Sequence, residues 1–128
     1  MNATQVQDQS LFERLGGMAA IDAAVDIFYQ RVLADPAINR FFENVDMAKQ
    51  RAKQKAFLAY AFGAPVPYSG KDLTQAHAHL VADGLNDSHF DAVAGHLQAT
   101  LEELGVAPEL TGEVMGIAAS TRDAVLGR

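Results

Sequence analysis

Hydrophobic residues recur along the chain at steps of three and four positions, a spacing that places them on one face of a helix. The clearest run lies within 18–34, where Ile21, Val25, Phe28 and Val32 follow this spacing. Almost no segment alternates hydrophobic and polar residues with the period of two that is typical of a half-buried strand. The pattern therefore predicts an all-α fold.

Glycine, proline and capping residues divide this pattern into separate helices. The pair Gly16–Gly17 ends a short first helix that begins near Leu11, and Asp35–Pro36 ends the second helix. The prolines and glycines that follow Gly63 predict a loop. The remaining helices are expected to be a short one with Ile38, Phe41 and Phe42, and longer ones over 47–62, 71–82, from Asn86 or Asp87 to Gly105, and 108–126.

Composition narrows the class of protein. The 128 residues are 49% hydrophobic and 20% charged, which is typical of a globular domain, and no apolar run approaches the roughly 20 residues of a membrane span. No repeat or linker divides the chain, so we expect one domain over 11–128 after a polar tail over 1–10. That tail lacks the features of a secretory signal, and we expect a cytoplasmic monomer. Because the chain has no cysteine, disulfides, thiolate nucleophiles and cysteine-bound metals are excluded.

Two of the four histidines lie close together, as His77 and His79. On a helix they point in opposite directions, because two positions correspond to about 200° of rotation. His77 falls on the hydrophobic stripe that includes Leu73 and Leu80, so it is the histidine that we expect to face inward. It has two interpretations at this point, a hydrogen-bonded core residue or a metal ligand. A shared zinc site would require a strand, which the pattern does not favour.

The long helix over 47–62 carries polar residues where hydrophobic ones are expected. Gln50 and Gln54 lie four positions apart on its apolar face, and Tyr29 brings a phenol to the apolar face of the preceding helix. Buried amides need hydrogen-bond partners, because an unsatisfied one costs about 1–3 kcal/mol. The three side chains are explained either by hydrogen bonds among themselves or by a pocket for a small polar ligand.

Basic residues concentrate in the same helix and suggest a second function class. Lys49, Arg51, Lys53 and Lys55 lie within seven positions, as on a helix that follows the phosphates of a nucleic acid in an all-α regulatory module. They cannot all lie on one face of the helix, and the net charge of −6 disfavours nucleic-acid binding. We keep this module as the alternative.

Several motifs follow one another in order between residues 11 and 126: LFERLGG, AVDIFYQRVLADP, the pair FF, VDMAKQRAKQKAFLAYAFG, YSG, AHAHL and HFDAVAGHLQATLEELGV. In order and spacing they resemble the group I truncated haemoglobins. The resemblance implies a shortened globin fold, in which helices form a two-over-two sandwich around haem b.

The resemblance also implies roles for individual residues. His77 corresponds to the proximal ligand of the haem iron, Phe42 to a phenylalanine against the haem, and Tyr29, Gln50 and Gln54 to the distal hydrogen-bonding set. Further contacts with the haem are expected from Phe57, Leu58, Phe62, Tyr68, Leu73, Phe90, Val93 and Leu97.

Two positions depart from some relatives. Thr121 stands where certain cyanobacterial relatives have a histidine that attaches to the haem, so we expect noncovalent binding. Lys53 stands on the distal side, where some relatives have a histidine that closes on the iron. Its stem is long enough either to bring its ammonium group to a haem propionate or to bring a neutral amine to the iron.

The function implied by the resemblance is reversible binding of dioxygen, and also of nitric oxide and carbon monoxide, at a histidine-ligated iron. Relatives of this kind are associated with oxidation of nitric oxide to nitrate. That activity would need electrons from an external reductase, and neither a nucleic acid nor a membrane is expected as a partner.

Overall fold

The helices of the chain are short and are separated by glycines, prolines and capping residues. A computed structural model describes residues 9–65 and 72–128, and within these residues it contains helices and no strand. The predicted all-α class is confirmed. The elements are α2 (Leu11–Leu15), α3 (Gly17–Leu33), the 3-10 helix η1 (Asn39–Phe42), α4 (Met47–Ala61), α5 (Leu73–Ala82), α6 (Asp87–Glu103), α7 (Pro108–Ser120) and α8 (Arg122–Leu126).

Polar side chains begin these helices by accepting hydrogen bonds from backbone N–H groups that have no partner within the helix. Asp46 caps α4 by accepting from Ala48 N at 3.1 Å. Asn86 caps α6 by accepting from Ser88 N at 3.0 Å, which confirms the first of the two predicted caps. Ser10, at the end of the predicted tail, caps α2.

The last predicted helix is not continuous. It ends at Ser120, and a second helix begins at Arg122, whereas the hydrophobic pattern predicted one helix over 108–126. The hydroxyl group of Ser120 donates to the carbonyl oxygen of Ile117 at 2.5 Å, and that of Thr121 donates to Ala118 at 2.7 Å. Hydroxyl groups that bind these carbonyls compete with the backbone ladder, which favours an end of the helix at this point.

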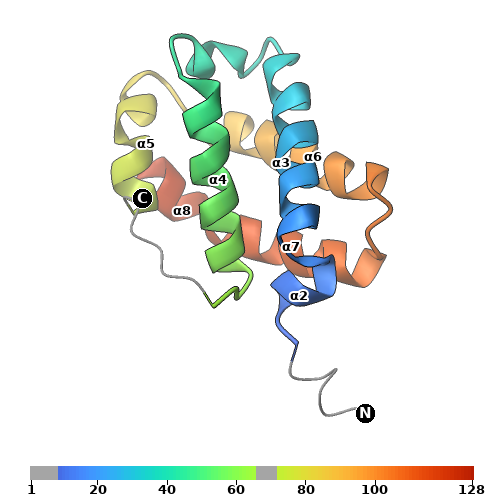
Figure 1. Cartoon of the computed structure of the whole chain (residues 1–128). Coiled ribbons are helices and arrows are strands. Elements are labelled where there is room, and N and C mark those ends of the chain that lie inside the picture. Colours follow the sequence, from blue (N-terminus) through green and yellow to red (C-terminus); the bar gives the residue numbers. More distant parts are fainter. Residues whose placement is uncertain (1–8, 66–71) are drawn as a thin grey trace, which may run out of the picture.

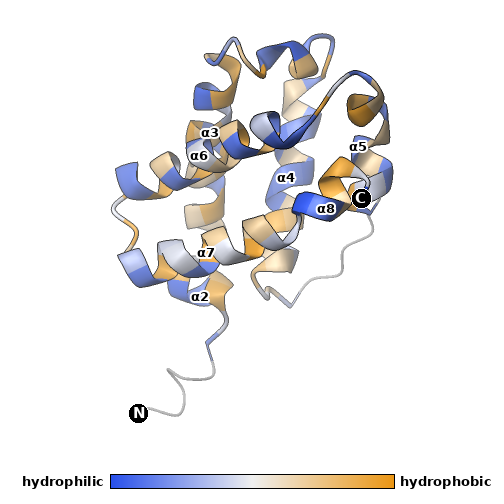
Figure 2. Cartoon of the chain, turned by 180° about the vertical axis from the view of Figure 1, so that it is seen from behind, coloured by the Kyte–Doolittle hydropathy of each residue, from blue (hydrophilic) through white to orange (hydrophobic). Residues whose placement is uncertain are grey.

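The main helices form two layers. Helix α3 packs against α4 in one layer and against α6 in the other, and α6 packs against α7. In Figure 1, α3 and α4 stand side by side at the front, while α6 and α7 cross behind them. Seen from behind, α6 and α7 lie in front, and both carry hydrophobic residues among polar ones (Figure 2). The predicted two-over-two arrangement is confirmed, with α5 and α8 packed together beside it.

The core lies between the two layers. Its buried members come from α2, α3, α4, α6 and α7 and from the residues next to them, and none comes from α5 or α8. Gly63, which follows α4, has a φ of +96°, and a Cβ atom built there would approach the Cβ atom of Ser10 to 3.0 Å. Glycine therefore permits both the turn after α4 and its close approach to α2. None of the helices within 9–65 and 72–128 has both the length and the hydropathy that a membrane span requires. The buried cluster consists of Leu11, Ile21, Val25, Phe28, Tyr29, Val32, Ile38, Leu58, Phe62, Leu101 and Val114.

Candidate functional site: a distal pair and a proximal histidine

A phenol and an amide meet between the two helices of the front layer. Tyr29 lies on α3 and is only 2% exposed. Gln50, half-buried on the facing side of α4, donates from Nε2 to the hydroxyl oxygen of Tyr29 at 3.1 Å. Because the hydroxyl oxygen accepts this bond, the phenolic proton points elsewhere, and no acceptor within the described residues takes it. The pair therefore presents an oriented hydrogen-bond donor.

Burial keeps Tyr29 in its neutral form. The apolar surroundings raise the pKa of the phenol above its ordinary value, because they disfavour the phenolate. The hydrogen bond from Gln50 acts in the opposite direction and lowers the pKa by a smaller amount. Since the net pKa is raised, Tyr29 keeps its proton throughout the neutral and mildly alkaline range and can act as a donor there.

An aromatic ring and a second amide lie near this pair. The ring of Phe42, at the end of η1, meets the ring of Tyr29 edge to face, with centroids 5.9 Å apart and planes at 73°. Gln54 is half-buried on α4, one turn after Gln50, so both amides lie on the same side of the helix. The structure therefore joins Tyr29, Gln50 and Phe42 directly and places Gln54 beside Gln50.

The helix α5 supplies the histidine. His77 is half-buried, whereas His79, two residues later, is exposed. The Nδ1 atom of His77 lies 2.7 Å from the carbonyl oxygen of Leu73, one turn earlier in α5. Since a carbonyl can only accept, Nδ1 carries the proton, and Nε2 keeps the lone pair that a metal ligand needs. This hydrogen bond also fixes the orientation of the ring.

These donors fit the chemistry of a haem group. A neutral imidazole with a free Nε2 is a common axial ligand of haem iron, and a buried neutral hydroxyl is a suitable donor to a small ligand on the other side. The described residues place these two groups on different helices, α5 and α3. This fit requires only the imidazole and the hydroxyl group. It does not require a metal site built from carboxylates or from several histidines.

The residues predicted to contact the haem divide into three groups. Leu58 and Phe62 belong to the buried core, and they line an apolar cavity of about 170 Å³ together with Leu97. Tyr68 lies outside the described residues. The remaining ones are half-buried, namely Phe42, Phe57, Leu73, Phe90, Val93 and Leu97.

The basic residues of α4 separate into two pairs. Arg51 and Lys55 face α3, where Nε of Arg51 lies 3.9 Å from Asp26 and Nζ of Lys55 lies 3.6 Å from Asp22. Lys53 is exposed, in contrast to the half-buried Gln50 and Gln54 that flank it. Because two of the four cations are already paired with carboxylates, the continuous basic face of the alternative interpretation does not form.

Two interactions were not predicted from the sequence. Nε2 of His96 on α6 donates to Asp35 at 2.7 Å, and this bond, together with one from Ala37 N, lowers the pKa of the Asp35 carboxyl. A second cluster joins Phe41 to His89, with ring centroids 5.0 Å apart. Both link residues far apart in the chain. The Asp35–Pro36 motif indicated only the end of a helix, and no pattern in the sequence pointed to its partner.

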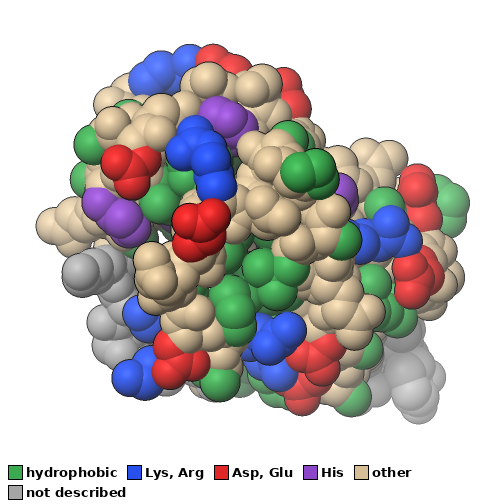
Figure 3. All heavy atoms as spheres, turned by 90° about the horizontal axis from the view of Figure 1, so that it is seen from above, with side chains coloured by type: hydrophobic (Ala, Val, Ile, Leu, Met, Phe, Trp, Pro, Cys, Tyr) green, Lys and Arg blue, Asp and Glu red, His purple; other side chains and the backbone are tan. Residues whose placement is uncertain are grey.

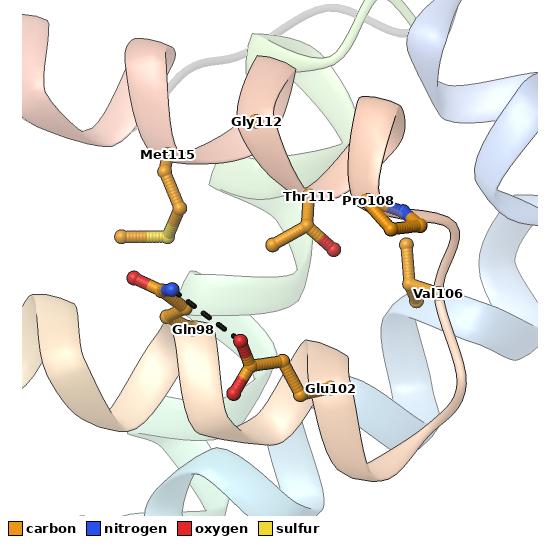
Figure 4. Close-up of a pocket in the computed structure, with 7 residues that line it drawn as sticks. All are labelled: Gln98, Glu102, Val106, Pro108, Thr111, Gly112 and Met115. Carbon is orange, nitrogen blue, oxygen red and sulfur yellow. Dashed lines mark hydrogen bonds between the residues drawn. The ribbon is translucent and has the colours of Figure 1, made fainter.

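A separate hollow of about 300 Å³ lies between α6 and α7 (Figure 4). Gln98 and Glu102 on α6 face Thr111 and Met115 on α7, and the amide of Gln98 donates to Glu102 at 3.4 Å. None of the predicted haem-contacting residues lines this hollow. It is therefore distinct from the distal and proximal groups described above.

Comparison with known proteins identifies the family. The model of the family described as bacterial-like globin matches residues 10–126. The group 1 truncated hemoglobin of Synechocystis sp. is 56% identical over 110 residues, which make up 85% of this chain and 89% of that protein. The chain belongs to the group 1 truncated haemoglobins. This membership confirms the predicted family and supports binding of small ligands at a haem by this globin.

Solved globin structures match the same arrangement of helices. The 2/2 hemoglobin from Synechococcus sp. PCC 7002, in the cyanomet state with covalently attached heme, has a TM-score of 0.91 and 50% identity, and the match covers 94% of this chain and 100% of that one. The Fe(III) form of the truncated hemoglobin from Tetrahymena pyriformis has a TM-score of 0.86 and 42% identity, with the same coverage. In this globin the position expected to correspond to a haem-attaching histidine is Thr121, whose hydroxyl group is bound to Ala118.

Proposed function

We propose that this globin holds haem b noncovalently, with His77 as the proximal ligand, and binds dioxygen reversibly beside Tyr29 and Gln50. Carbon monoxide and nitric oxide are further ligands of the same site. A ferrous haem supplies an iron that binds diatomic gases, and its environment decides how long they stay. The haem-contacting residues of the proposal, including Tyr68, are those that the resemblance implies.

On the proximal side, a hydrogen bond within α5 orients the ring of His77. The hydrogen bond from His77 Nδ1 to the Leu73 carbonyl leaves Nε2 as the coordinating atom and increases the basicity of the ring. Because the bond partner lies one turn earlier in α5, the ring is held by its own helix. His79 is exposed and has no place in this role.

On the distal side, the hydrogen bond from Gln50 to Tyr29 is the observation that carries the proposal. It occupies the hydroxyl oxygen of Tyr29 and leaves the proton for a ligand with negative charge on its oxygen atoms. Dioxygen draws more electron density from ferrous iron than carbon monoxide does, so the donor favours dioxygen. Gln54, on the same side of α4, is proposed as a second donor.

Oxidation of nitric oxide to nitrate is proposed as an activity of the same site. The reaction consumes one nitric oxide, one dioxygen and one electron for each nitrate. The electron must come from an external reductase, since none of the side chains described in the site is a redox carrier. The chain's part in this reaction is to retain dioxygen through Tyr29 until nitric oxide arrives.

The dioxygen dissociation rate of a Tyr29→Phe variant tests the proposal. Loss of a hydrogen bond to a charged acceptor is worth about 1.5–3 kcal/mol, so dissociation should accelerate by about tenfold or more. Tyr60→Phe is the control, because Tyr60 is 52% exposed at the far end of α4 and its variant should release dioxygen at the parent rate. Equal rates for Tyr29→Phe and the parent would show that the phenol does not act on the ligand.

A further inference from the structure

A cluster of side chains joins η1 to the connection between α5 and α6. The guanidinium group of Arg40 donates from Nη1 to the carbonyl oxygen of Asp83, which caps the end of α5, at 3.3 Å. Its Nη2 atom would lie 3.5 Å from a Cβ atom at Gly84, so the guanidinium packs closely against the backbone there. Arg40 therefore contacts the C-cap residue of α5 and the glycine that follows it.

Contacts between aromatic rings extend the same cluster to the start of α6. The guanidinium carbon of Arg40 lies 4.0 Å from the centre of the Phe41 ring, and the ring of His89 meets Phe41 edge to face at 5.0 Å. His89 is itself fixed, because its Nδ1 accepts from the backbone N–H of Asn86 at 3.0 Å. A planar guanidinium can stack on a ring and donate to a carbonyl at the same time, which an ammonium cannot do.

The two segments that this cluster joins carry opposite sides of the proposed haem site. Next to Phe41 in η1 is Phe42, which contacts Tyr29 on the distal side. On the other segment, α5 carries His77. In Figure 1, η1 lies at the top of the molecule and the connection from α5 to α6 lies at the upper left. The view from above shows hydrophobic side chains between basic, acidic and histidine side chains on this end (Figure 3).

Helix α5 packs mainly on the short helix α8, and none of its residues belongs to the buried cluster between the two layers. The hydrogen bond of Arg40 to Asp83 and its contact with Gly84 give the C-terminal end of α5 a link to η1. A link of this kind restricts the movement of the helix that carries His77.

We propose that Arg40 is a positioning residue of the haem site, which fixes the end of α5 against η1 through Asp83, Phe41 and His89. Arg40 slows the escape of haem and restricts the movement of His77 relative to Phe42. This inference rests on the proposed role of His77 as the proximal ligand. It assigns a function to Arg40, Phe41 and His89 that does not require any of them to touch the iron or its ligand.

The test is the rate of haem transfer from the reconstituted protein to an excess of apomyoglobin, for Arg40→Ala and for Arg14→Ala. Both variants lose one guanidinium and one positive charge, but Arg14 is bound to Glu113 and joins α2 to α7, away from α5. We expect Arg40→Ala to lose haem about tenfold faster than the parent, which is the effect of one such contact, and Arg14→Ala less than about twofold faster. Arg40→Lys should lose haem more slowly than Arg40→Ala but faster than the parent, since lysine keeps the positive charge without the planar guanidinium group.

Urea unfolding of the apoproteins separates positioning from general stability. If Arg40→Ala and Arg14→Ala destabilise the apoprotein equally and only the first accelerates haem loss, the positioning role stands. The iron–histidine stretching band in the ferrous resonance Raman spectrum should also broaden in Arg40→Ala alone. Equal rates of haem loss in the two variants would overturn the inference while leaving the proposed function intact. Full haem retention by His77→Ala would overturn both the inference about Arg40 and the proposed function.

Discussion

Tyr29 is the buried side chain that we propose as the hydrogen-bond donor on the distal side. Burial keeps it neutral, and Gln50 determines where its proton points. The sequence predicted this group of polar residues because Gln50, Gln54 and Tyr29 interrupt apolar faces. It did not predict which amide binds Tyr29, since two residues four positions apart share one face of a helix. The choice depends on the position of α4 along α3, which only the packed structure defines.

The sequence predicted two alternative roles for Lys53, contact with a haem propionate and binding to the iron. We propose that its amine binds the iron when no gas is present. The side chain is exposed on α4 and its stem is long enough to fold over the distal side. Lys53→Ala should then change the ferric and ferrous protein from low-spin to high-spin, and dioxygen should bind faster because no amine must be displaced. Absorption spectra and stopped-flow mixing measure these two effects.

Lys49→Ala is the matched control for Lys53. Lys49 is also exposed and lies one turn earlier in α4, so its variant carries the same change in charge. It should keep the spectrum of the parent. If Lys53→Ala also keeps that spectrum, Lys53 is a propionate partner or a surface charge and not an iron ligand.

At the scale of elements, the sequence predicted helix starts better than helix contacts. The start of α6 after Asn86 was recognised because capping depends on residues only a few positions away. The break at Thr121 was missed because the hydrophobic spacing continues through it, while hydroxyl bonds to Ile117 and Ala118 interrupt the backbone. The bond between His96 and Asp35 connects α6 to the end of α3, and a contact over 61 positions leaves no mark in local spacing.

The bond between Asp35 and His96 gives the stability of the fold a dependence on pH. The pKa of Asp35 is lowered in the folded state, first by His96 and then by the N–H of Ala37. Its contribution to stability is therefore present above the unfolded pKa of about 3.9 and is lost as the pH falls through the lower folded pKa. Asp35→Asn should melt at a lower temperature than the parent at pH 6, and the difference should shrink towards pH 3. A difference that stays constant over this range in thermal melts monitored by circular dichroism would contradict this account.

At the scale of the whole molecule, two crossed layers of helices leave α5 on one side, where it packs on α8. The two-layer arrangement followed from the resemblance to a family and not from helical spacing alone, because hydrophobic faces do not specify which helices meet. The place of α5 bears on the proposed function, since this helix carries His77, the residue that we propose as the proximal ligand. It packs on α8, and we propose that the Arg40 cluster and the haem hold it as well.

The attachment of the haem, covalent or noncovalent, concerns the protein as a whole. One solved relative has covalently attached heme, whereas the corresponding position here is expected to be Thr121, which has no imidazole ring. We predict that acidified butanone extracts all the haem from the reconstituted protein. Mass spectrometry of the denatured chain should then give the mass of the polypeptide alone. A chain that retains the added mass of a haem would refute noncovalent binding.

The central claim, that this globin holds haem through His77, is tested most directly by haem titration of His77→Ala and His79→Ala. The two histidines lie on one helix, but only His77 is half-buried with its ring fixed by Leu73. The account predicts that the parent and His79→Ala develop an intense Soret band with one equivalent of haem. His77→Ala should lose the spectrum of an imidazole-bound iron and most of its affinity for haem. Equal haem binding and identical spectra in the two variants would contradict the account.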